Sequence, residues 1–247
     1  MIYVLRRIVS NTLLTFPASS MQPGTTGILR TILNTAMAKT LLLSSSRPKS
    51  CCALFEGRSC LAEVNTDIPY GQAAKLPALI EQALKQARLS LCEVECFVVD
   101  RGPGSFTGIR ASIAWMIGVC VFAPRPLHLC NRFEALHHSA SAPKDCLILL
   151  DSRRDQPFYQ LRKNGTIVAS GQKDFKALTH DRSQTILCEK SLEEQLPYED
   201  KSYFHEFSVQ DLLLTGLGKP AVTTLSELAL YGRDAVVDPR AKQSFAC

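Results

Sequence analysis

A glycine-rich turn between an apolar strand and an apolar helix constrains the fold of this chain more than any other segment. Residues 100–110 read DRGPGSFTGIR and follow the apolar run 96–99. The glycines permit backbone angles that other residues rarely adopt, and Ser105 can cap a helix. We therefore predict a buried strand, a tight turn and a helix over 106–122 that ends before Pro124. This order of elements indicates an α/β protein.

The same turn has the features of an anion site, because a strand leads through glycines into a helix N-terminus. It matches neither familiar phosphate loop: no Lys follows the last glycine, and the glycine spacing is GxGxxxG rather than GxGxxG. Two interpretations stay open, a structural turn and an anion site. The residues of that site would be Arg101, Gly102, Pro103, Gly104, Ser105, Phe106, Thr107, Gly108 and Arg110.

Apolar runs and turn residues predict further elements on both sides of this turn. In the first half we expect strands over 40–43, 51–55 and 59–64 and a helix over 73–88. In the second half we expect a strand over 147–151, an Asn-Gly hairpin near 163–165 and a short helix near 223–231. The repetition indicates two related lobes, lobe I over 39–125 and lobe II over 126–247.

The first segment differs in composition from the rest, because residues 1–36 contain three arginines and no acidic residue. This bias is shared by organellar transit peptides. The other interpretation is a start codon placed too early, with translation beginning at Met37. We favour the second, since an apolar strand begins directly after Met37. Residues 1–38 are thus expected to be an N-terminal extension that is disordered or not translated.

Charge and cysteine usage narrow the class of protein. The net charge of +5 arises in residues 1–55, which hold six cations and no acid, so RNA contact by this chain alone is not expected. The ten cysteines include no Cys-x-x-Cys pair and mostly lie in apolar runs. They indicate reduced cysteines in the core of a cytoplasmic protein. No uncharged apolar stretch reaches the roughly 18 residues of a membrane span.

The segment Gly102–Arg110, GPGSFTGIR, resembles the signature of the TsaB (YeaZ) family, relatives of the TsaD/Kae-type proteins. Order along the chain adds to the resemblance, which covers about 39–240. The further matching segments are the early strand–hairpin–strand, the helix around Leu76–Ile80, Leu150–Arg154 and Val237–Arg240. The resemblance implies a two-lobed sugar-kinase/Hsp70/actin-like (ribonuclease H-like) fold with a reduced second lobe.

What the resemblance implies about function is specific. Family members lack the catalytic machinery of TsaD but bind it through two helices of the first lobe. With the ATPase TsaE, the complex makes threonylcarbamoyladenosine next to the anticodon of ANN-reading tRNAs. The resemblance therefore implies a non-catalytic scaffold subunit without a cofactor, a homodimer formed through the same helices, and tRNA contact only within the complex.

The residues of helix 106–122 agree with such an interface. One apolar stripe contains Ile109, Ile113, Met116, Ile117 and Cys120, and a second contains Trp115, Val119 and Phe122. One stripe can cover the sheet, while the other needs a partner or a second layer of this chain. Trp115 is the candidate anchor. The predicted partner interface is Leu76, Leu79, Ile80, Ala83, Ile109, Ile113, Trp115, Met116 and Val119.

Catalytic features of the wider family are missing from the sequence. The five histidines form no His-x-x-x-His pair, so no metal site of the TsaD kind is predicted. Ser44 stands where relatives carry an Asp, and 70–73 read YGQA in place of Glu-His-Ser. Both changes weaken a nucleotide site. The alternative, a small ATP-binding phosphotransferase or ATPase using Gly102–Gly108, is therefore disfavoured, and a peptidase lacks support.

Overall fold

The computed structural model describes residues 38–66, 72–154, 156–178, 185–194 and 202–222. The predicted N-terminal extension, the helix near 223–231 and the segment Val237–Arg240 lie outside these residues. In the described part of the chain, no helix is both long and apolar enough to cross a membrane.

The first sheet forms as the glycine turn and its neighbours predict. It contains β1 (Lys39–Ser44), β2 (Cys51–Glu56), β3 (Ser59–Asn65), β4 (Cys96–Asp100) and β5 (Leu127–Cys130), in the order β3-β2-β1-β4-β5. The β1–β2–β3 pairs are antiparallel, while β1–β4 and β4–β5 are parallel. The central strands β1 and β4 are buried on both faces, which explains their continuous apolar runs.

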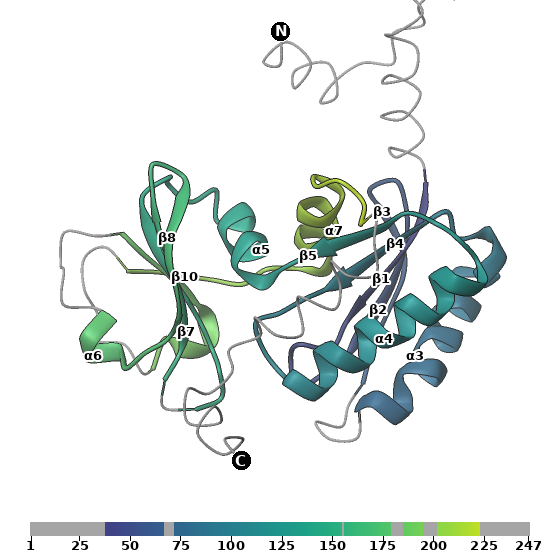
Figure 1. Ribbon diagram of the computed structural model, residues 1–247, viewed down its shortest axis with the longest axis horizontal. Helices are drawn as coiled ribbons and strands as arrows, with labels where there is room; N and C mark the ends of the chain where they lie inside the picture. Colours follow the sequence, from purple (N-terminus) through teal and green to yellow (C-terminus); the bar gives the residue numbers. More distant parts are fainter. Residues whose placement is uncertain (1–37, 67–71, 155, 179–184, 195–201, 223–247) are drawn as a thin grey trace, which may run out of the picture. The chain divides into compact units, whose positions relative to one another are not determined.

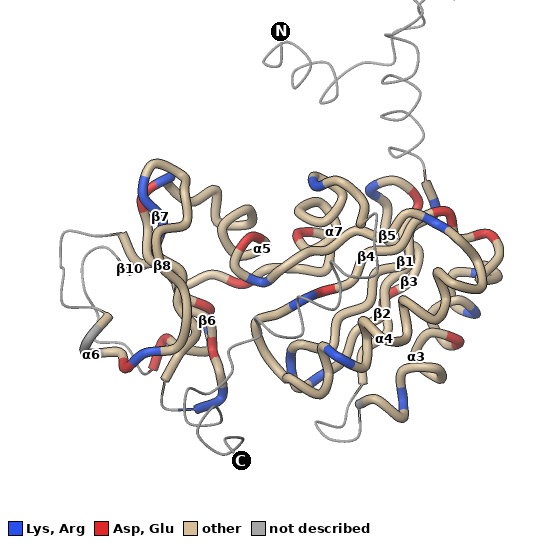
Figure 2. The backbone as a smooth tube through the Cα atoms, in the orientation of Figure 1, with Lys and Arg blue, Asp and Glu red and all other residues tan. Residues whose placement is uncertain are grey.

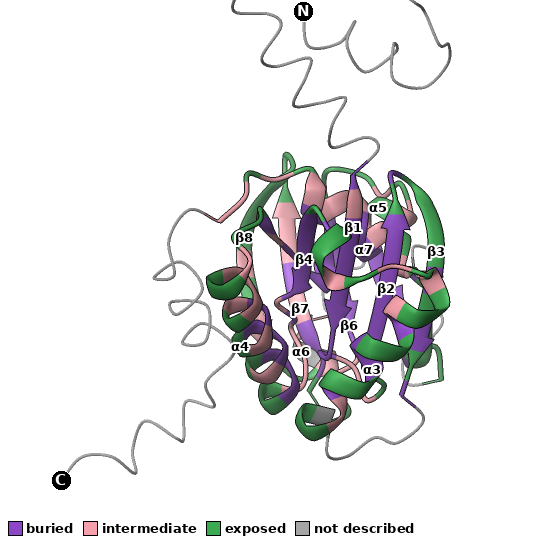
Figure 3. Cartoon of the chain, turned by 90° about the vertical axis from the view of Figure 1, so that its right-hand side faces the viewer, coloured by how far each residue is buried: buried purple, intermediate pink, exposed green. Residues whose placement is uncertain are grey.

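Two long helices cover one face of this sheet (Figure 1). They are α3 (Gln72–Ala87) and α4 (Phe106–Phe122). Their inner sides and the sheet enclose an apolar core, whereas the outer sides of both helices are exposed in Figure 3. The short helix η1 (Leu91–Glu93) precedes β4.

The second sheet repeats the topology of the first. It contains β6 (Cys146–Leu150), β7 (Phe158–Lys163), β8 (Thr166–Gln172), β9 (Ile186–Glu189) and β10 (Ser202–His205), in the order β8-β7-β6-β9-β10. The pairs again run antiparallel for β6–β7–β8 and parallel for β6–β9–β10. The hairpin prediction is confirmed, since Asn164 and Gly165 both have positive φ between β7 and β8.

The reduction of the second lobe lies in its helices. Where the first lobe has α3 and α4, the described residues of the second have only α6 (Phe175–Leu178) and η2 (Lys190–Leu192). Its five-stranded sheet is retained. The predicted two-lobed α/β fold with a reduced second lobe is therefore confirmed.

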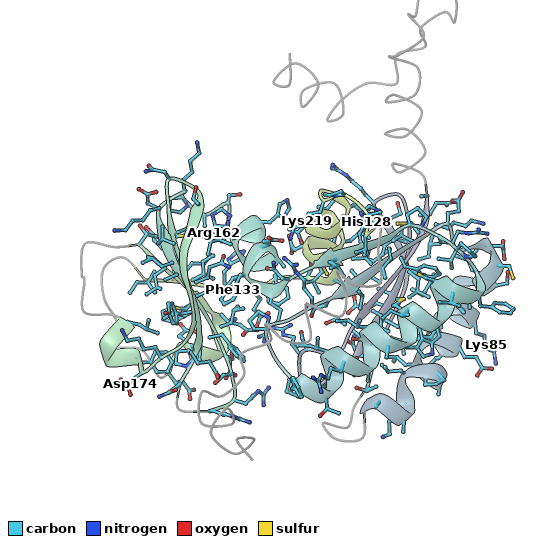
Figure 4. The ribbon with its side chains drawn as sticks, viewed as in Figure 1. Lys85, His128, Phe133, Arg162, Asp174 and Lys219 are labelled. Atoms are coloured by element: carbon cyan, nitrogen blue, oxygen red, sulfur yellow. The ribbon has the colours of Figure 1, made fainter. Side chains whose placement is uncertain are left out.

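Each of two further helices follows a strand of one sheet but packs on the other sheet. After β5, α5 (Arg132–Ser139) packs on β6 and β9, while α7 (Val209–Leu217) returns to pack on β4 and β5, an arrangement called here the exchange of α5 and α7. At Gly216 of α7 an added Cβ would lie 2.7 Å from Val98 Cγ1, so the helix lies directly on the first sheet. His128 of β5 lies beside Lys219, with Nδ1 2.9 Å from the Lys219 carbonyl oxygen (Figure 4).

The predicted boundary between the lobes requires a correction. The sequence predicts it after residue 125, but β5 pairs in parallel with β4 and extends the first sheet to Cys130. The first lobe also includes α7 from the C-terminal part of the chain. The boundary was misplaced because β5 has only four residues, between prolines and a helix cap, and such a short segment also fits a linker.

Candidate functional site

The glycine turn is held closely against the loop that follows β1. Gly104 packs so tightly that an added Cβ would lie 2.0 Å from the Ser46 carbonyl oxygen. The Ser105 N–H donates to that same oxygen at 2.8 Å, and Gly102 has φ of 92°. The Ser105 hydroxyl accepts from the Gly108 N–H, which confirms the predicted helix cap. Both glycines are thus required by conformation or by close approach.

A buried carboxylate lies beneath the turn. Asp100 is fully buried and accepts hydrogen bonds from the Ser44 hydroxyl at 2.7 Å, from the Gly102 N–H at 2.7 Å, and from the Ser46 hydroxyl. Burial raises the pKa of Asp100, while the hydrogen bonds from these donors act in the opposite direction. Ser44 at the end of β1 therefore donates to a carboxylate on the neighbouring strand β4.

A second buried carboxylate occupies the matching position of the second lobe. Glu189 ends β9 as Asp100 ends β4, and it is 3% exposed. It accepts from Arg132 Nη2 at 2.6 Å, from Arg47 Nη2 at 2.5 Å and from the Asp151 N–H at 3.0 Å. Burial alone would raise the pKa of Glu189, but the two guanidinium groups outweigh it and hold the pKa below its ordinary value.

Glu189 lines a cleft of about 1230 Å³, together with Ser44 and Ser46, which donate to Asp100. Its walls include the loop after β1, the glycine turn and the start of the second lobe. The charged residues that line it are Arg47, Lys49, Glu63, Arg132, Asp151, Arg153, Arg154 and Glu189. Asp151 accepts from the Arg153 N–H at 2.6 Å, so it acts as a turn residue. An excess of cations therefore lines this cleft.

The predicted residues of the glycine loop divide between the interior and the surface. Gly102 and Gly108 are buried, and Phe106, Thr107 and Arg110 are exposed. Intermediate exposure is found at Arg101, Pro103, Gly104 and Ser105. The N–H groups of Gly102, Ser105 and Gly108 all donate within the protein. The hydrogen bonds thus fit the structural-turn interpretation better than the anion site.

The outer side of α4 is exposed but, unlike the outer side of an ordinary surface helix, carries almost no charge. Its 17 residues include a single charged side chain, Arg110 (Figure 2). Arg110 lies over the Phe106 ring, 3.8 Å from its centroid. The exposed residues of α4 are Phe106, Thr107, Arg110, Ala114, Gly118, Val121 and Phe122. At Gly118 an added Cβ would have nothing within 4 Å, so this side is open.

Most of the predicted interface residues lie beneath the helices instead. Seven of the nine are at most 7% exposed and belong to the core of the first lobe: Leu76, Leu79, Ile80, Ala83, Ile109, Ile113 and Met116. They face the sheet, so the prediction that they contact a partner is replaced by a core assignment. Trp115 and Val119 are half-buried and pack against the same core. They lie beside the exposed face rather than at its centre.

Sequence reasoning missed the two buried carboxylates and the arginines that connect the lobes. Asp100 was recognised only as the end of a strand, and Arg47, Arg132 and Glu189 were not singled out. A usable signal exists for the carboxylates, since each directly follows an apolar run and ends a strand. Nothing in the local sequence distinguishes Arg132 from a surface arginine at the start of a helix.

Comparison with known proteins gives consistent results. A family model described as tRNA N6-adenosine threonylcarbamoyltransferase (TsaD) matches residues 72–246. YeaZ from Pseudomonas aeruginosa superposes with a TM-score of 0.55 and 18% identity, covering 81% of this chain and 98% of that one. A second structure from the same organism, described as an uncharacterized protein with similarity to peptidase YeaZ, gives 0.58 and 19% with the same coverage.

A curated relative matches over a shorter region. Uncharacterized protein ML0378 of Mycobacterium leprae is 29% identical over 117 residues, which are 47% of this chain. The chain spans about a third of that relative's length, 32%.

Proposed function

Because this chain belongs to the tRNA N6-adenosine threonylcarbamoyltransferase (TsaD) family and has the YeaZ fold, we propose that it is a non-catalytic scaffold subunit that binds a TsaD-type catalyst. Family and fold agree with the resemblance of Gly102–Arg110 to the TsaB motif. Its setting is then the complex that places threonylcarbamoyl on the adenosine next to the anticodon of ANN-reading tRNAs. A TsaE-type ATPase joins the complex in the cytoplasm, and tRNA is contacted only there.

The observation that carries this proposal is the exposed side of α4. A helix with one charge in 17 residues has the composition of a buried helix, yet Phe106, Val121 and Phe122 are 45%, 68% and 91% exposed. Burying an exposed apolar side chain of this size contributes about 1.5–3 kcal/mol. The two small residues between them, Ala114 and Gly118, leave room for the backbone of a partner helix to approach closely.

Within the described residues, the elements that pack most extensively on α4 are α3, β1 and β4, all from the first lobe. With Phe106, Val121 and Phe122 45%, 68% and 91% exposed, the outer face is open among the described residues. The same face serves a homodimer in the absence of the catalyst, because a self-complementary apolar patch joins two copies around a two-fold axis. The catalyst and the second copy then compete for one surface.

The test is a charge placed on this face, compared with the same charge elsewhere. Val121→Glu should abolish co-elution with the TsaD-type subunit of the same organism on size-exclusion chromatography. Val168→Glu on β8 is the matched control, because Val168 is also an exposed valine, at 51%, and belongs to the second lobe. Equal co-elution of both variants would refute docking through α4. If the dimer uses the same face, Val121→Glu also elutes as a monomer.

The alternative role of a phosphotransferase or ATPase fits the cleft less well. The cations of the cleft suit an anion, but Glu189, which lines it, is already engaged by Arg47 and Arg132. Asp100 is fully buried and accepts from Ser44. Among the described residues, no cluster of three His, Cys, Asp or Glu could hold a metal ion. Calorimetry of the isolated protein with ATP and magnesium is expected to show no micromolar binding. Measured binding in that range would revive the enzyme hypothesis.

A further inference from the structure

A continuous run of hydrogen bonds leads from the second lobe to the first turn of α4. Glu189 of β9 accepts from Arg132 Nη2 at 2.6 Å, and Arg132 Nη1 donates to the Pro103 carbonyl oxygen at 2.8 Å. Pro103 is two residues before Ser105, the cap of α4. The second lobe is thus connected, through Arg132, to the glycine turn that precedes α4.

Arg132 holds the glycine turn at two adjacent carbonyls. Its backbone N–H donates to the Gly102 carbonyl oxygen at 2.9 Å, and its side chain takes the next carbonyl, that of Pro103. Arg132 begins α5, which packs on the second sheet. A displacement of that sheet therefore moves both carbonyls together.

The other end of the connection is equally fixed. Glu189 is held within its own lobe by the Asp151 N–H and from the first lobe by Arg47. The side chains of Arg132 and Glu189 are each 3% exposed, so water and salt screen their ion pair little. Charge-assisted hydrogen bonds between buried groups are strong and directional, which suits a rigid connection.

We infer that Arg132 and Glu189 are positioning residues that set the direction of α4, so that affinity for the catalytic partner depends on the second lobe. This inference rests on the proposed docking through α4. It gives the second lobe a role although its own counterparts of α3 and α4 are short. By thermodynamic reciprocity, a partner bound to α4 must also affect the surroundings of Glu189.

The test uses a substitution that keeps the charge and removes the bridge. In Arg132→Lys, a single ammonium group cannot hold Pro103 and Glu189 in the planar geometry of a guanidinium. We expect the dissociation constant for the TsaD-type subunit to rise by about 5-fold or more. Hydrogen exchange at the Ser105 and Ile109 amides should become faster, while exchange in β6 stays unchanged.

The matched control is Arg153→Lys. Arg153 lies at the start of the second lobe, with Nε 3.4 Å from Asp151 Oδ2, and it is 69% exposed, whereas Arg132 is 3% exposed. Its affinity for the partner is expected to equal that of the wild type. All affinities are measured at a temperature where melting curves show each variant fully folded.

Three results separate the hypotheses. A folded Arg132→Lys that binds as tightly as the wild type overturns the positioning role and leaves the docking proposal intact. A wild-type protein that does not bind the partner at all overturns the docking proposal itself. If Arg132→Lys does not fold, Glu189→Asp takes its place, because it keeps the charge but is one methylene too short to reach both arginines. A folded Glu189→Asp with wild-type affinity overturns the positioning role as well.

Discussion

Gly104→Ala tests the geometry on which the glycine turn depends. The new methyl carbon would lie 2.0 Å from the Ser46 carbonyl oxygen and 2.8 Å from its carbonyl carbon. Both are backbone atoms, so no side-chain rotation can relieve the contact. The turn must move by about 1 Å to reach even the shortest separation seen for real Cβ atoms.

The cost follows from that displacement. Moving the turn breaks the 2.8 Å hydrogen bond from the Ser105 N–H to Ser46, which contributes about 0.5–1.5 kcal/mol. Crowding a well-packed site adds about 1–3 kcal/mol. The free energy of unfolding should therefore fall by roughly 2–4 kcal/mol. For a domain of this size, each kcal/mol lowers Tm by about 2–4 °C, so a decrease of roughly 5–15 °C is expected.

Thermal unfolding followed by circular dichroism measures this change, and Gly118→Ala is the control. At Gly118 the added methyl group meets nothing within 4 Å, and alanine is the better helix former by about 1 kcal/mol. That variant should melt about 2–4 °C above the wild type. A Gly104→Ala protein that melts within 2 °C of the wild type would refute the close packing of the turn on Ser46.

Two further predictions concern the buried carboxylates. Asp100→Ala leaves two serine hydroxyls and the Gly102 N–H without their acceptor, and each buried unsatisfied group costs about 1–3 kcal/mol. Urea unfolding should therefore show that the free energy of unfolding falls by at least about 3 kcal/mol. A decrease below about 1 kcal/mol would contradict the hydrogen-bond network around Asp100. Although burial raises it, the pKa of folded Glu189 is held by its arginines below the ordinary 4.5. The contribution of ionised Glu189 to the free energy of unfolding is therefore present above the ordinary pKa of 4.5 and is lost as the pH falls through its lower folded pKa. The Tm difference between wild type and Glu189→Gln should shrink below that pH, and a difference independent of pH would contradict the ion pair.

Much of the fold could be predicted because local signals and tertiary structure agree. The apolar runs of β1, β4 and β6, the Asn164-Gly165 turn and the Ser105 cap all form as their residues indicate. The sequence did not predict α5 or α7, which are only eight and nine residues long, and so could not reveal which sheet each one covers. That choice depends on contacts between residues far apart along the chain.

The candidate site was predicted in place but not in detail. Helix α4 was identified from its apolar residues and divided into two stripes, but residues of both stripes were assigned to the interface, since nearly all of its residues are apolar. Ile113 and Val121 have similar side chains, and only the direction of the helix on the sheet separates a core position from an exposed one. The glycine turn, by contrast, was located correctly because local backbone angles and close contacts require glycine at 102 and 104.

The exchange of α5 and α7 has a consequence for how this protein can be made. The first sheet is complete once Cys130 has been synthesised, but the helix that seals its second side is 209–217. Until that helix leaves the ribosome, Val98 and its neighbours remain in water, a state that invites aggregation or chaperone binding. Neither half is therefore a self-sufficient folding unit, and a cut between them would leave both fragments with an uncovered apolar surface.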